Sequence, residues 1–233
     1  MAYGSLRESL GLGLLGSLRP HLTAFWPCNE ASGNPVDLVQ GLTLTANGTP
    51  GYEEAIGGTG RTGIKLDGDS TTYLNRSAAF WPKSSGWTLN FLFDDDGEGV
   101  DPGVFVAAVT DASNRIIFSH DNTNHITIFD SATRVLSGSI SPYDNAGHMF
   151  TFVQTQYGHY TAYFDGAWTG ITITGGSTKT PEEFTDFDVS RQGSLSGGQP
   201  GIYGDIAIWN CALPENAVAA IWNSGSVRDP RGV

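Results

Sequence analysis

The sequence predicts an all-β protein, built as one antiparallel two-sheet sandwich with a short helix near its C-terminus. Short runs in which apolar and polar residues alternate follow one another along the chain, as expected of strands with one buried face. The 31 glycines and 11 prolines suffice for many tight turns, and 11% of the residues are aromatic, which suits pleated surfaces. No linker-like stretch and no recurring motif divides the 233 residues, so we expect a single sandwich.

The alternating runs define the expected strands. In residues 148–156, Met149 and Val153 fall on one side of the strand while Phe150 and Phe152 fall on the other. A strand that is apolar on both sides is predicted to be central. The runs as a whole are residues 23–26, 42–45, 63–68, 87–93, 115–120, 125–130, 148–154, 159–166, 170–174 and 205–209.

Turn signals connect neighbouring runs into antiparallel hairpins. Residues 121–124 (DNTN) separate two of the runs. Asp165 and Gly166 form the Asp-Gly pair that favours a two-residue type I′ turn, in which both positions need a positive φ. The strands are therefore expected to meander.

One helix is predicted, in residues 214–225 (PENAVAAIWNSG). Pro214 suits the first helical position and Gly225 suits the residue that ends a helix. The apolar side chains of this segment share one side, so the helix is expected to pack on one end of the sandwich; they are Val218, Ile221 and Trp222.

We expect residues 1–21 to form an N-terminal docking arm, residues 22–226 the domain and residues 227–233 a polar C-terminal tail. The arm and the tail are predicted to contact other protein subunits, in a homo-oligomer or in a capsid or tail lattice. Leucines recur at every fourth position of the arm, which places them on one side of a helix. These assembly residues are Leu6, Leu10, Leu14 and Leu18.

The arm is interpreted as neither a secretion signal nor a membrane span. Arg7 and Glu8 lie where a signal peptide needs apolar continuity, and no small-residue cleavage site follows. The apolar stretch is also shorter than the roughly 20 residues that cross a bilayer.

Charge limits the classes of partner. The formal net charge is −12, with 12 basic residues against 24 acidic ones, so a nucleic-acid backbone would be repelled. The sequence therefore predicts no nucleic-acid partner, whereas its acidic loops suit cations.

Four segments, in this order, resemble the laminin G-like branch of the concanavalin A-like lectin/glucanase superfamily. The resemblance covers residues 22–226, implies a jelly-roll arrangement of the two sheets, and departs from the family pattern at KLDG (65–68) and in the acidic insertion 94–103. Such domains mostly bind carbohydrates, glycoproteins, receptors or other subunits, sometimes through calcium. The segments are AFWPCNEASG (24–33), GIKLDGDSTTYLN (63–75), MFTFVQTQYGHYTAYFDGAWTG (149–170) and GIYGDIAIWNCALPENAVAAIWNSG (201–225).

The resemblance also bears on the two cysteines, Cys28 and Cys211, because the opening and closing strands lie side by side in the family. A disulfide across these strands and two separate packed thiols are both compatible with that placement. One pair of cysteines in a chain of this length does not identify an oxidising compartment.

An acidic, glycine-containing loop is the candidate metal site. Carboxylates are the hard oxygen ligands that calcium prefers, although their spacing here is not that of an EF-hand. No cofactor is expected to be required, and calcium is the ion that these ligands would suit. The candidate ligands are Asp94, Asp96, Glu98 and Asp101.

Aromatic residues next to turns are the candidate sugar-binding residues. An exposed aromatic ring can stack on a pyranose while nearby polar groups bind its hydroxyls. Each of these rings could equally be a packing residue at the edge of the core. The candidates are Trp81, Trp87, Tyr143, Tyr157 and Trp168.

We find no catalytic constellation in the sequence. A retaining glycosidase needs two carboxyl groups about 5 Å apart, and no strand carries two glutamates at alternate positions. Ser119 and His120 are neighbours on a strand, so they point to opposite faces and do not form a nucleophile–base pair.

Together, these observations predict a non-catalytic structural and binding module of an assembly. The leading interpretation is a virion surface protein, as a capsid decoration, tail or adhesin component that also binds glycans, made in the host cytoplasm. This setting is implied by the resemblance, because laminin G-like domains occur in virions of tailed phages. The alternatives are an extracellular lectin, secreted or on a cell surface, and, ranked last, a glycoside hydrolase.

Overall fold

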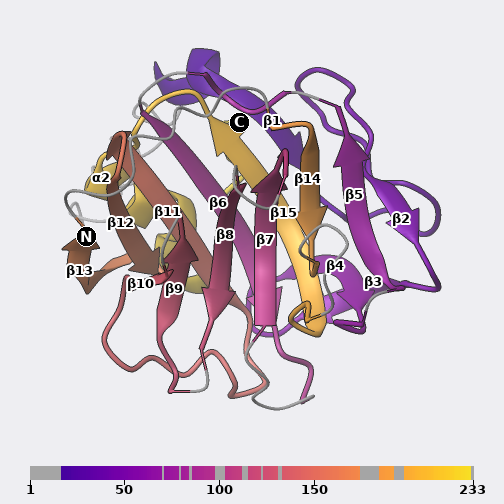
Figure 1. The fold of residues 1–233 in the computed structure, drawn as a ribbon. Helices are drawn as coiled ribbons and strands as arrows, with labels where there is room; N and C mark the ends of the chain where they lie inside the picture. The colour runs from indigo at the N-terminus through magenta and orange to yellow at the C-terminus, as the bar shows by residue number, and fades with distance from the viewer. Residues whose placement is uncertain are drawn as a thin grey trace, which may run out of the picture.

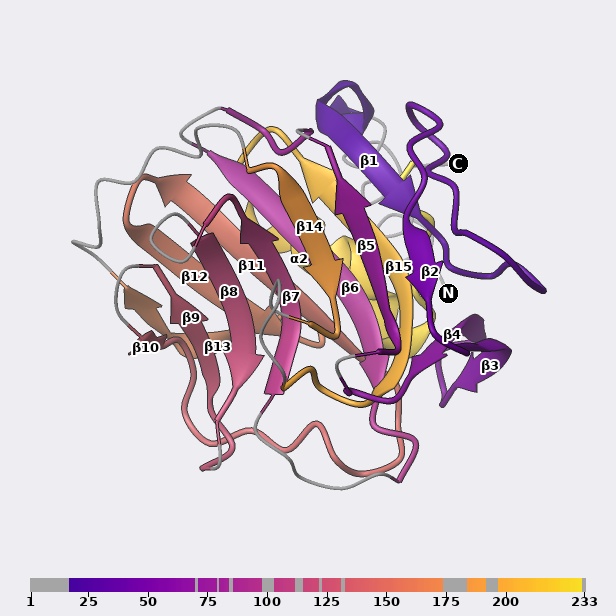
Figure 2. The same cartoon turned by 45° about the vertical axis from the view of Figure 1, so that its right-hand side comes forward.

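The protein is a two-sheet jelly-roll sandwich in the computed structural model, which confirms the predicted fold class (Figure 1). The structure describes residues 17–69, 71–78, 80–83, 86–97, 103–111, 115–121, 123–130, 133–173, 184–191 and 197–231. Both sheets are antiparallel. The second sheet lies in front of the first in Figure 1, and Figure 2 shows the same two layers after a turn of 45°.

The first sheet has eight strands in the order β13-β12-β11-β6-β15-β4-β3, and β1 pairs with β15 beside this path. Its strands are β1 (Leu22–Trp26), β3 (Gly51–Ile56), β4 (Arg61–Leu66), β6 (Trp87–Asp94), β11 (His148–Gln156), β12 (His159–Phe164), β13 (Ala167–Ile173) and β15 (Gly201–Trp209).

The second sheet has seven strands in the order β10-β9-β8-β7-β14-β5-β2. Its strands are β2 (Thr45–Asn47), β5 (Tyr73–Ser77), β7 (Gly103–Val109), β8 (Arg115–His120), β9 (Ile126–Phe129), β10 (Thr133–Val135) and β14 (Asp186–Val189). The helical segments are η1 (Arg19–His21), α2 (Glu215–Trp222) and η2 (Asn223–Gly225).

The main core lies between the sheets and is rich in aromatic rings. Phe105 of the second sheet packs against Phe150 and Phe93 of the first, with ring centroids 4.9 Å and 5.0 Å apart. Burial of each such side chain contributes about 1.5–3 kcal/mol to folding. The inner faces of the two sheets are therefore held together chiefly by apolar burial.

A second apolar layer covers the outer face of the first sheet. Helix α2 buries Val218 and Ile221 in a cluster that includes Met149 of β11 and Trp209 of β15. β11 is consequently buried on both faces along most of its length, as predicted for a central strand. This helix determines which part of the sheet remains accessible.

Helix α2 differs from the prediction in place and in detail. It packs on the outer face of the first sheet, whereas the expectation was one end of the sandwich. Pro214 is the N-cap, with an extended backbone, and the helix ends at Trp222 instead of continuing to Gly225. Asn223 takes the left-handed conformation at φ 46° and terminates the helix, a role that asparagine can take in place of glycine.

Several strands escaped the sequence analysis, among them β3, β5, β7 and β14. β7 is buried on both faces, so its sequence is a continuous apolar run without alternation. β3 exposes three consecutive residues, so it also lacks the period-two pattern. Both predicted hairpins are present, between β8 and β9 and between β12 and β13.

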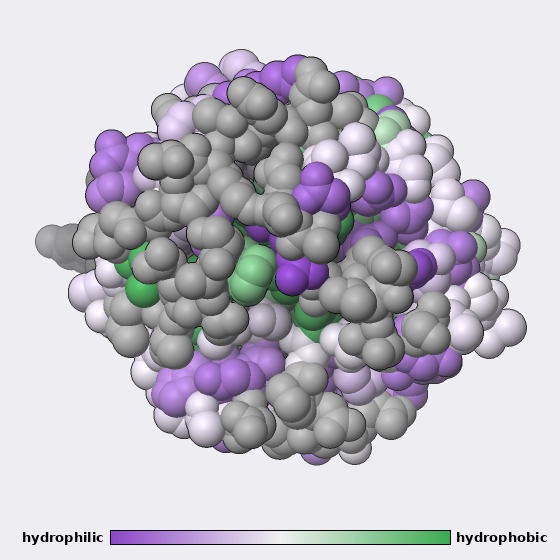
Figure 3. Space-filling view, viewed as in Figure 1, coloured by the Kyte–Doolittle hydropathy of each residue, from purple (hydrophilic) through white to green (hydrophobic). Residues whose placement is uncertain are grey.

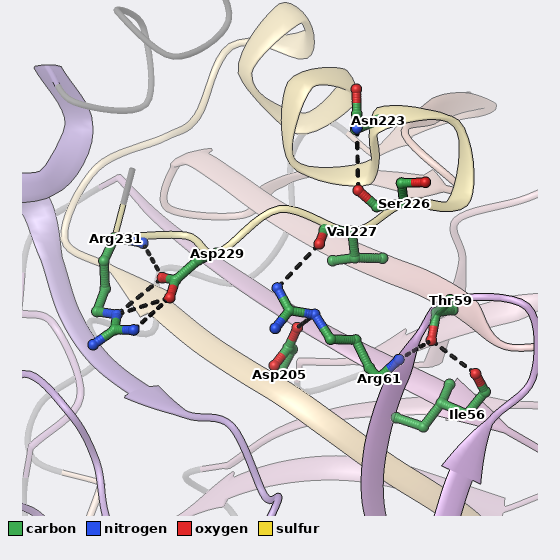
Figure 4. A network of polar contacts seen from close by, with 9 residues as sticks. All are labelled: Ile56, Thr59, Arg61, Asp205, Asn223, Ser226, Val227, Asp229 and Arg231. Carbon is green, nitrogen blue, oxygen red and sulfur yellow. Dashed lines mark hydrogen bonds and ion pairs between the residues drawn. The ribbon is translucent and has the colours of Figure 1, made fainter. Parts of the chain in front are cut away.

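The described part of the C-terminal tail packs on its own domain (Figure 4). Arg61 of β4 donates a hydrogen bond to the Val227 carbonyl at 3.0 Å and lies 3.1 Å from the Asp205 carboxylate of β15. Val227 is buried, and Arg231 lies over the ring of Phe25. Residues 227–231 therefore make intramolecular contacts, whereas the expectation was that the tail contacts neighbouring subunits.

Only the end of the arm is described. Leu18 packs against the apolar layer that covers the first sheet, and the 3-10 turn η1 leads directly into β1. Leu6, Leu10 and Leu14 lie outside the described residues, so their predicted role in assembly stays a prediction.

Most coloured residues on the face of the molecule shown in Figure 3 are hydrophilic or near neutral, and hydrophobic ones form small separate patches. Among the described residues, no helix is both long and apolar enough to span a membrane.

Candidate functional site

The five aromatic residues predicted to bind sugar occupy very different environments. Trp81 and Trp87 are core residues, 5% and 0% exposed, which corrects the expectation that they offer a ring face to a ligand. Tyr143 is half-buried, and its hydroxyl group contacts His120 and Gln199. Tyr157 is also half-buried, at the turn between β11 and β12. Trp168 alone among the five is widely exposed, at 51%.

Trp168 lies on the outer face of the first sheet, on β13 at the edge of the sheet. It pairs with Tyr163 of β12, whose side chain packs in the cluster beneath helix α2. Cross-strand partners point to the same side of a sheet, so Trp168 stands on the face that α2 covers. The indole ring is nevertheless half exposed, which leaves it accessible beside the helix.

Polar residues lie on the same hairpin and on the neighbouring helix α2. Thr161 and Thr172 are cross-strand partners on the same face, and their hydroxyl oxygens lie 3.3 Å apart. Glu215 of α2 is exposed. The pKa of Tyr163 is raised, chiefly by burial of its hydroxyl group and also by the negative charge of Glu215. We call this surface the β12–β13 shelf; it consists of Thr161, Tyr163, Trp168, Thr172 and Glu215.

The hairpin that presents the shelf rests on helix α2. Asp165 and Gly166 form its turn with φ of 52° and 76°, as the Asp-Gly pair predicted. A Cβ atom at Gly166 would lie 2.9 Å from the Cβ of Trp222 and 3.1 Å from the Cα of Ala219. Only glycine permits this close approach, so the turn is held against the helix.

A histidine between two carboxylates braces the same turn, and the sequence analysis did not single it out. His148 Nδ1 lies 2.8 Å from Asp165 and Nε2 lies 2.9 Å from Asp144, while the ring stacks on Phe164. Burial opposes the charged form, but the two carboxylates outweigh it and raise the pKa of His148. The sequence gives little indication of this contact. His148 and the Asp-Gly turn are seventeen residues apart, and they come together only when β11 pairs with β12.

The carboxylates of the acidic loop are used by the protein itself. Asp94 accepts hydrogen bonds from the backbone N–H groups of Gly57 and Asp96, at 2.7 Å and 2.9 Å. Asp96 pairs with Lys65 Nζ at 2.6 Å. Glu98 and Asp101 lie outside the described residues. Within the described ranges, no three side chains of the metal-binding types come together, and calcium binding stays a prediction.

The two cysteines are separate thiols, so the disulfide alternative is wrong for this structure. The backbone of Asp205 pairs with Pro27, next to Cys28, whereas Asn210, next to Cys211, pairs with His21. The antiparallel register thus separates the cysteines by about seven residues of strand, roughly 23 Å. A disulfide needs Cα atoms about 5–7 Å apart.

The neighbours Ser119 and His120 do face opposite ways, as predicted. Ser119 Oγ lies 2.7 Å from Thr127 Oγ1, whereas His120 is buried and lies 2.8 Å from the Tyr143 hydroxyl. Burial lowers the pKa of His120 to about 4, so this ring is neutral at physiological pH. The Ser-His-Asp run therefore forms no catalytic triad.

Comparisons with known proteins agree with the fold. The sequence matches no protein-family model and no curated protein. Among solved structures, domain 4 of an extracellular GH43 arabinanase from Geobacillus stearothermophilus, in complex with arabinotriose, is similar with a TM-score of 0.68 at 13% identity. That match covers 85% of this chain and 96% of the arabinanase domain.

Two larger proteins contain a similar domain. Trypanosoma rangeli sialidase matches with a TM-score of 0.64 at 12% identity, over 94% of this chain and 38% of the sialidase. The receptor-binding domain of botulinum neurotoxin type G matches with a TM-score of 0.62 at 12% identity, over 88% of this chain and 51% of that domain. The chain thus spans about a third to a half of these proteins. At identities this low, the likeness establishes only the fold, a jelly-roll β-sandwich.

Proposed function

We propose that this protein is a non-catalytic glycan-binding module, in which Trp168 supplies the surface for one sugar ring. The observation that carries the proposal is the half-exposed indole of Trp168 on the β12–β13 shelf. A tryptophan exposes a large apolar face at a cost in free energy, so a ring held in this way suits an apolar partner such as the C–H face of a pyranose or furanose.

The rest of the shelf supplies the polar half of sugar recognition. The hydroxyl groups of Thr161 and Thr172 both donate and accept, and the Glu215 carboxylate accepts from sugar hydroxyls. The turn of the hairpin is braced by helix α2 and by His148, so the indole needs little further ordering when a ligand binds. Two of the similar structures are an arabinanase domain in complex with arabinotriose and a neurotoxin receptor-binding domain.

A matched pair of variants tests this proposal. Trp168→Ala should weaken glycan binding about tenfold or more, because the loss of about 1.4 kcal/mol of contact corresponds to a factor of 10. Leu38→Ala is the control, since Leu38 is 49% exposed, close to the 51% of Trp168, and lies in a turn outside the β12–β13 shelf. Binding would be measured by calorimetry on oligosaccharides selected from a glycan array, arabino-oligosaccharides included.

Equal glycan affinity of the Trp168→Ala and Leu38→Ala variants would show that Trp168 does not contact the sugar. If the wild type released reducing sugar from a bound oligosaccharide, the non-catalytic part of the proposal would be replaced by the glycoside hydrolase alternative.

The narrower role, a subunit of a virion, is a second proposal that rests on the resemblance to laminin G-like domains and on the leucine spacing of the arm. It is compatible with glycan binding, because a virion surface protein can attach to cell-surface glycans. The partners that it implies are other protein subunits, and its location is the virion, with an extracellular lectin as the alternative.

A further inference from the structure

One histidine joins three segments at the β12–β13 turn. His148 is the first residue of β11, Asp165 lies in the turn, and Asp144 belongs to the loop that precedes β11. Nδ1 of the ring lies 2.8 Å from Asp165 Oδ2, and Nε2 lies 2.9 Å from Asp144 Oδ1. The His148 side chain is only 10% exposed, so each ring nitrogen faces a carboxylate in a largely buried place.

These contacts determine the protonation state of the ring. A neutral imidazole has one N–H group and one lone pair, whereas an imidazolium has two N–H groups. An ionised carboxylate accepts hydrogen bonds and donates none, so two carboxylates require two N–H groups. Both carboxylates also accept from backbone N–H groups, Asp165 from Met149 at 2.9 Å and Asp144 from Ala146 at 3.1 Å. The geometry therefore requires a positively charged ring.

Among the described residues, His148 is the one histidine with a carboxylate at each ring nitrogen. His120 is buried against the Tyr143 hydroxyl, and burial lowers its pKa to about 4. His125 lies 3.3 Å from a single carboxylate, that of Asp121. The paired carboxylates are therefore particular to the turn that leads to Trp168.

Loss of the ring proton would reverse the interaction at one nitrogen. A lone pair would then face an ionised carboxylate at hydrogen-bonding distance, and that contact is repulsive. The charged groups that face the ring are Asp165 from the turn and Asp144 from the loop. The strands packed against it contribute the uncharged side chains of Phe164 in β12 and Phe93 in β6. Without the proton, two negative charges remain beside a ring that no longer balances them.

We propose that His148 is a proton-operated clamp, which holds the β12–β13 turn to the loop before β11 while the ring is protonated and loosens the turn when the proton leaves. Trp168 lies two residues beyond the turn, so loosening the turn would also disturb the shelf. The clamp itself follows from the contacts of His148, whereas its effect on glycan binding rests on the proposed function.

The direction of the pH effect follows from the two carboxylates. Burial lowers the pKa of His148, but the hydrogen bonds and charges of Asp165 and Asp144 outweigh burial and raise this pKa above 6.5. The folded state therefore holds the proton more tightly than the unfolded state. The contribution of the clamp to stability is complete below pH 6.5 and is lost as the pH rises through the raised pKa.

Nitrogen-15 NMR of the histidine rings in the full chain tests the protonation state. We expect N–H groups on both ring nitrogens of His148 at pH 6.5 and a titration midpoint above that pH, with the neutral ring of His120 as the internal control. Asp165→Asn is the matched variant, because Asn-Gly also favours the type I′ turn and the amide oxygen still accepts, but the charge is gone. Its His148 should titrate at a lower pH. A neutral His148 ring at pH 6.5 in the wild type, or an unchanged midpoint in Asp165→Asn, would overturn the proposal.

Amide hydrogen exchange tests whether the proton holds the turn. The Asp165 amide donates to the Met149 carbonyl at 2.9 Å, so its protection factor reports on opening of the turn. In the wild type this factor should fall across the pH range in which His148 titrates. In His148→Gln, which has no titrating ring, we expect a lower factor that stays constant over that range. Parallel profiles for the two proteins would contradict the clamp. If His148→Gln does not fold, Asp165→Asn makes the same comparison, since its protection should fall at a lower pH than that of the wild type.

Glycan affinity, measured by calorimetry over the same pH range, tests the connection to the shelf. The wild-type affinity should fall by about fivefold or more when His148 loses its proton, which is the lower end of typical coupling between two sites. His148→Gln should show no such step. A wild-type affinity that is equal above and below the midpoint would refute the connection between clamp and shelf. Absence of binding at every pH would instead refute the proposed function, and the NMR and exchange results would still decide the clamp.

Discussion

At the scale of single residues, the buried carboxylate of Asp205 shows how burial can change the pKa of a side chain. Asp205 lies at a bulge of β15 with a positive φ of 44°, and its side chain is only 4% exposed. Arg61 Nε lies 3.1 Å from Oδ2 but does not make a well-directed hydrogen bond to it. Burial therefore prevails over the nearby Arg61 charge and raises the pKa of Asp205 to about 6.

The pKa of Asp205 predicts a defined pH dependence of stability. The folded state binds this proton more tightly than the unfolded state, so the resulting stabilisation is complete below pH 3.8 and is lost as the pH rises through about 6. Between pH 4 and 7, the wild type should lose roughly 3 kcal/mol relative to Asp205→Asn, which does not titrate. Urea unfolding of both proteins at these pH values measures the difference. A constant difference across the range would show that the Asp205 pKa is not raised.

At the scale of elements, the β12–β13 hairpin connects the packing of helix α2 to the position of Trp168. The strand alternation and the Asp-Gly turn are local features, so the hairpin could be predicted from residues 159–174 alone. Its contact with Trp222 and Ala219 could not, because those residues lie about fifty positions further along the chain and approach only after the sheet has formed.

Two glycines of this hairpin make a matched test. Gly166 and Gly170 both have a positive φ, 76° and 93°, so alanine at either should cost about 1–2 kcal/mol in backbone strain. At Gly166 the added methyl group also collides with α2, which should cost about 1–3 kcal/mol more. No atom lies within 4 Å of a Cβ at Gly170.

Thermal and urea unfolding of Gly166→Ala and Gly170→Ala would measure these costs, and glycan affinity would report on the position of Trp168. We expect Gly166→Ala to be the less stable protein and the weaker binder. Equal stabilities would mean that the hairpin does not rest on the helix.

At the scale of the whole molecule, the arm is predicted to mediate assembly. The described tail is bound to its own domain through Arg61 and Val227, so the arm is left as the main segment predicted to contact other subunits. A net charge of −12 opposes close association unless specific contacts compensate for it. The leucines of the arm would supply such contacts.

Light scattering on the full chain and on a variant lacking residues 1–16 tests this prediction. The deletion retains Leu18, which packs on the domain, so folding should be preserved. We expect a symmetric oligomer for the full chain and a monomer after the deletion. Both measurements would be repeated with added calcium, which tests whether calcium binding changes the mass. Identical masses for the two proteins would exclude the arm from self-assembly.

Local patterns in the sequence were sufficient to predict the fold class, the central strand β11, both hairpins and the approximate position of α2. Each of these depends on residues close together in the chain, whose periodicity records which side is buried. Strands such as β7 were not predicted, because both of their faces are buried and their sequence therefore lacks the alternation of apolar and polar residues.

The functional surface depended on contacts between distant segments. Trp87 and Trp168 look alike in the sequence, since both lie next to turns, yet one faces the opposite sheet and the other stands at the sheet edge beside α2. Cys28 and Cys211 each follow the end of one of two paired strands, β1 and β15, but the strands are antiparallel, so the cysteines lie at opposite ends. Exposure and separation are set by which strands become neighbours and in what register, so only the tertiary structure decides them.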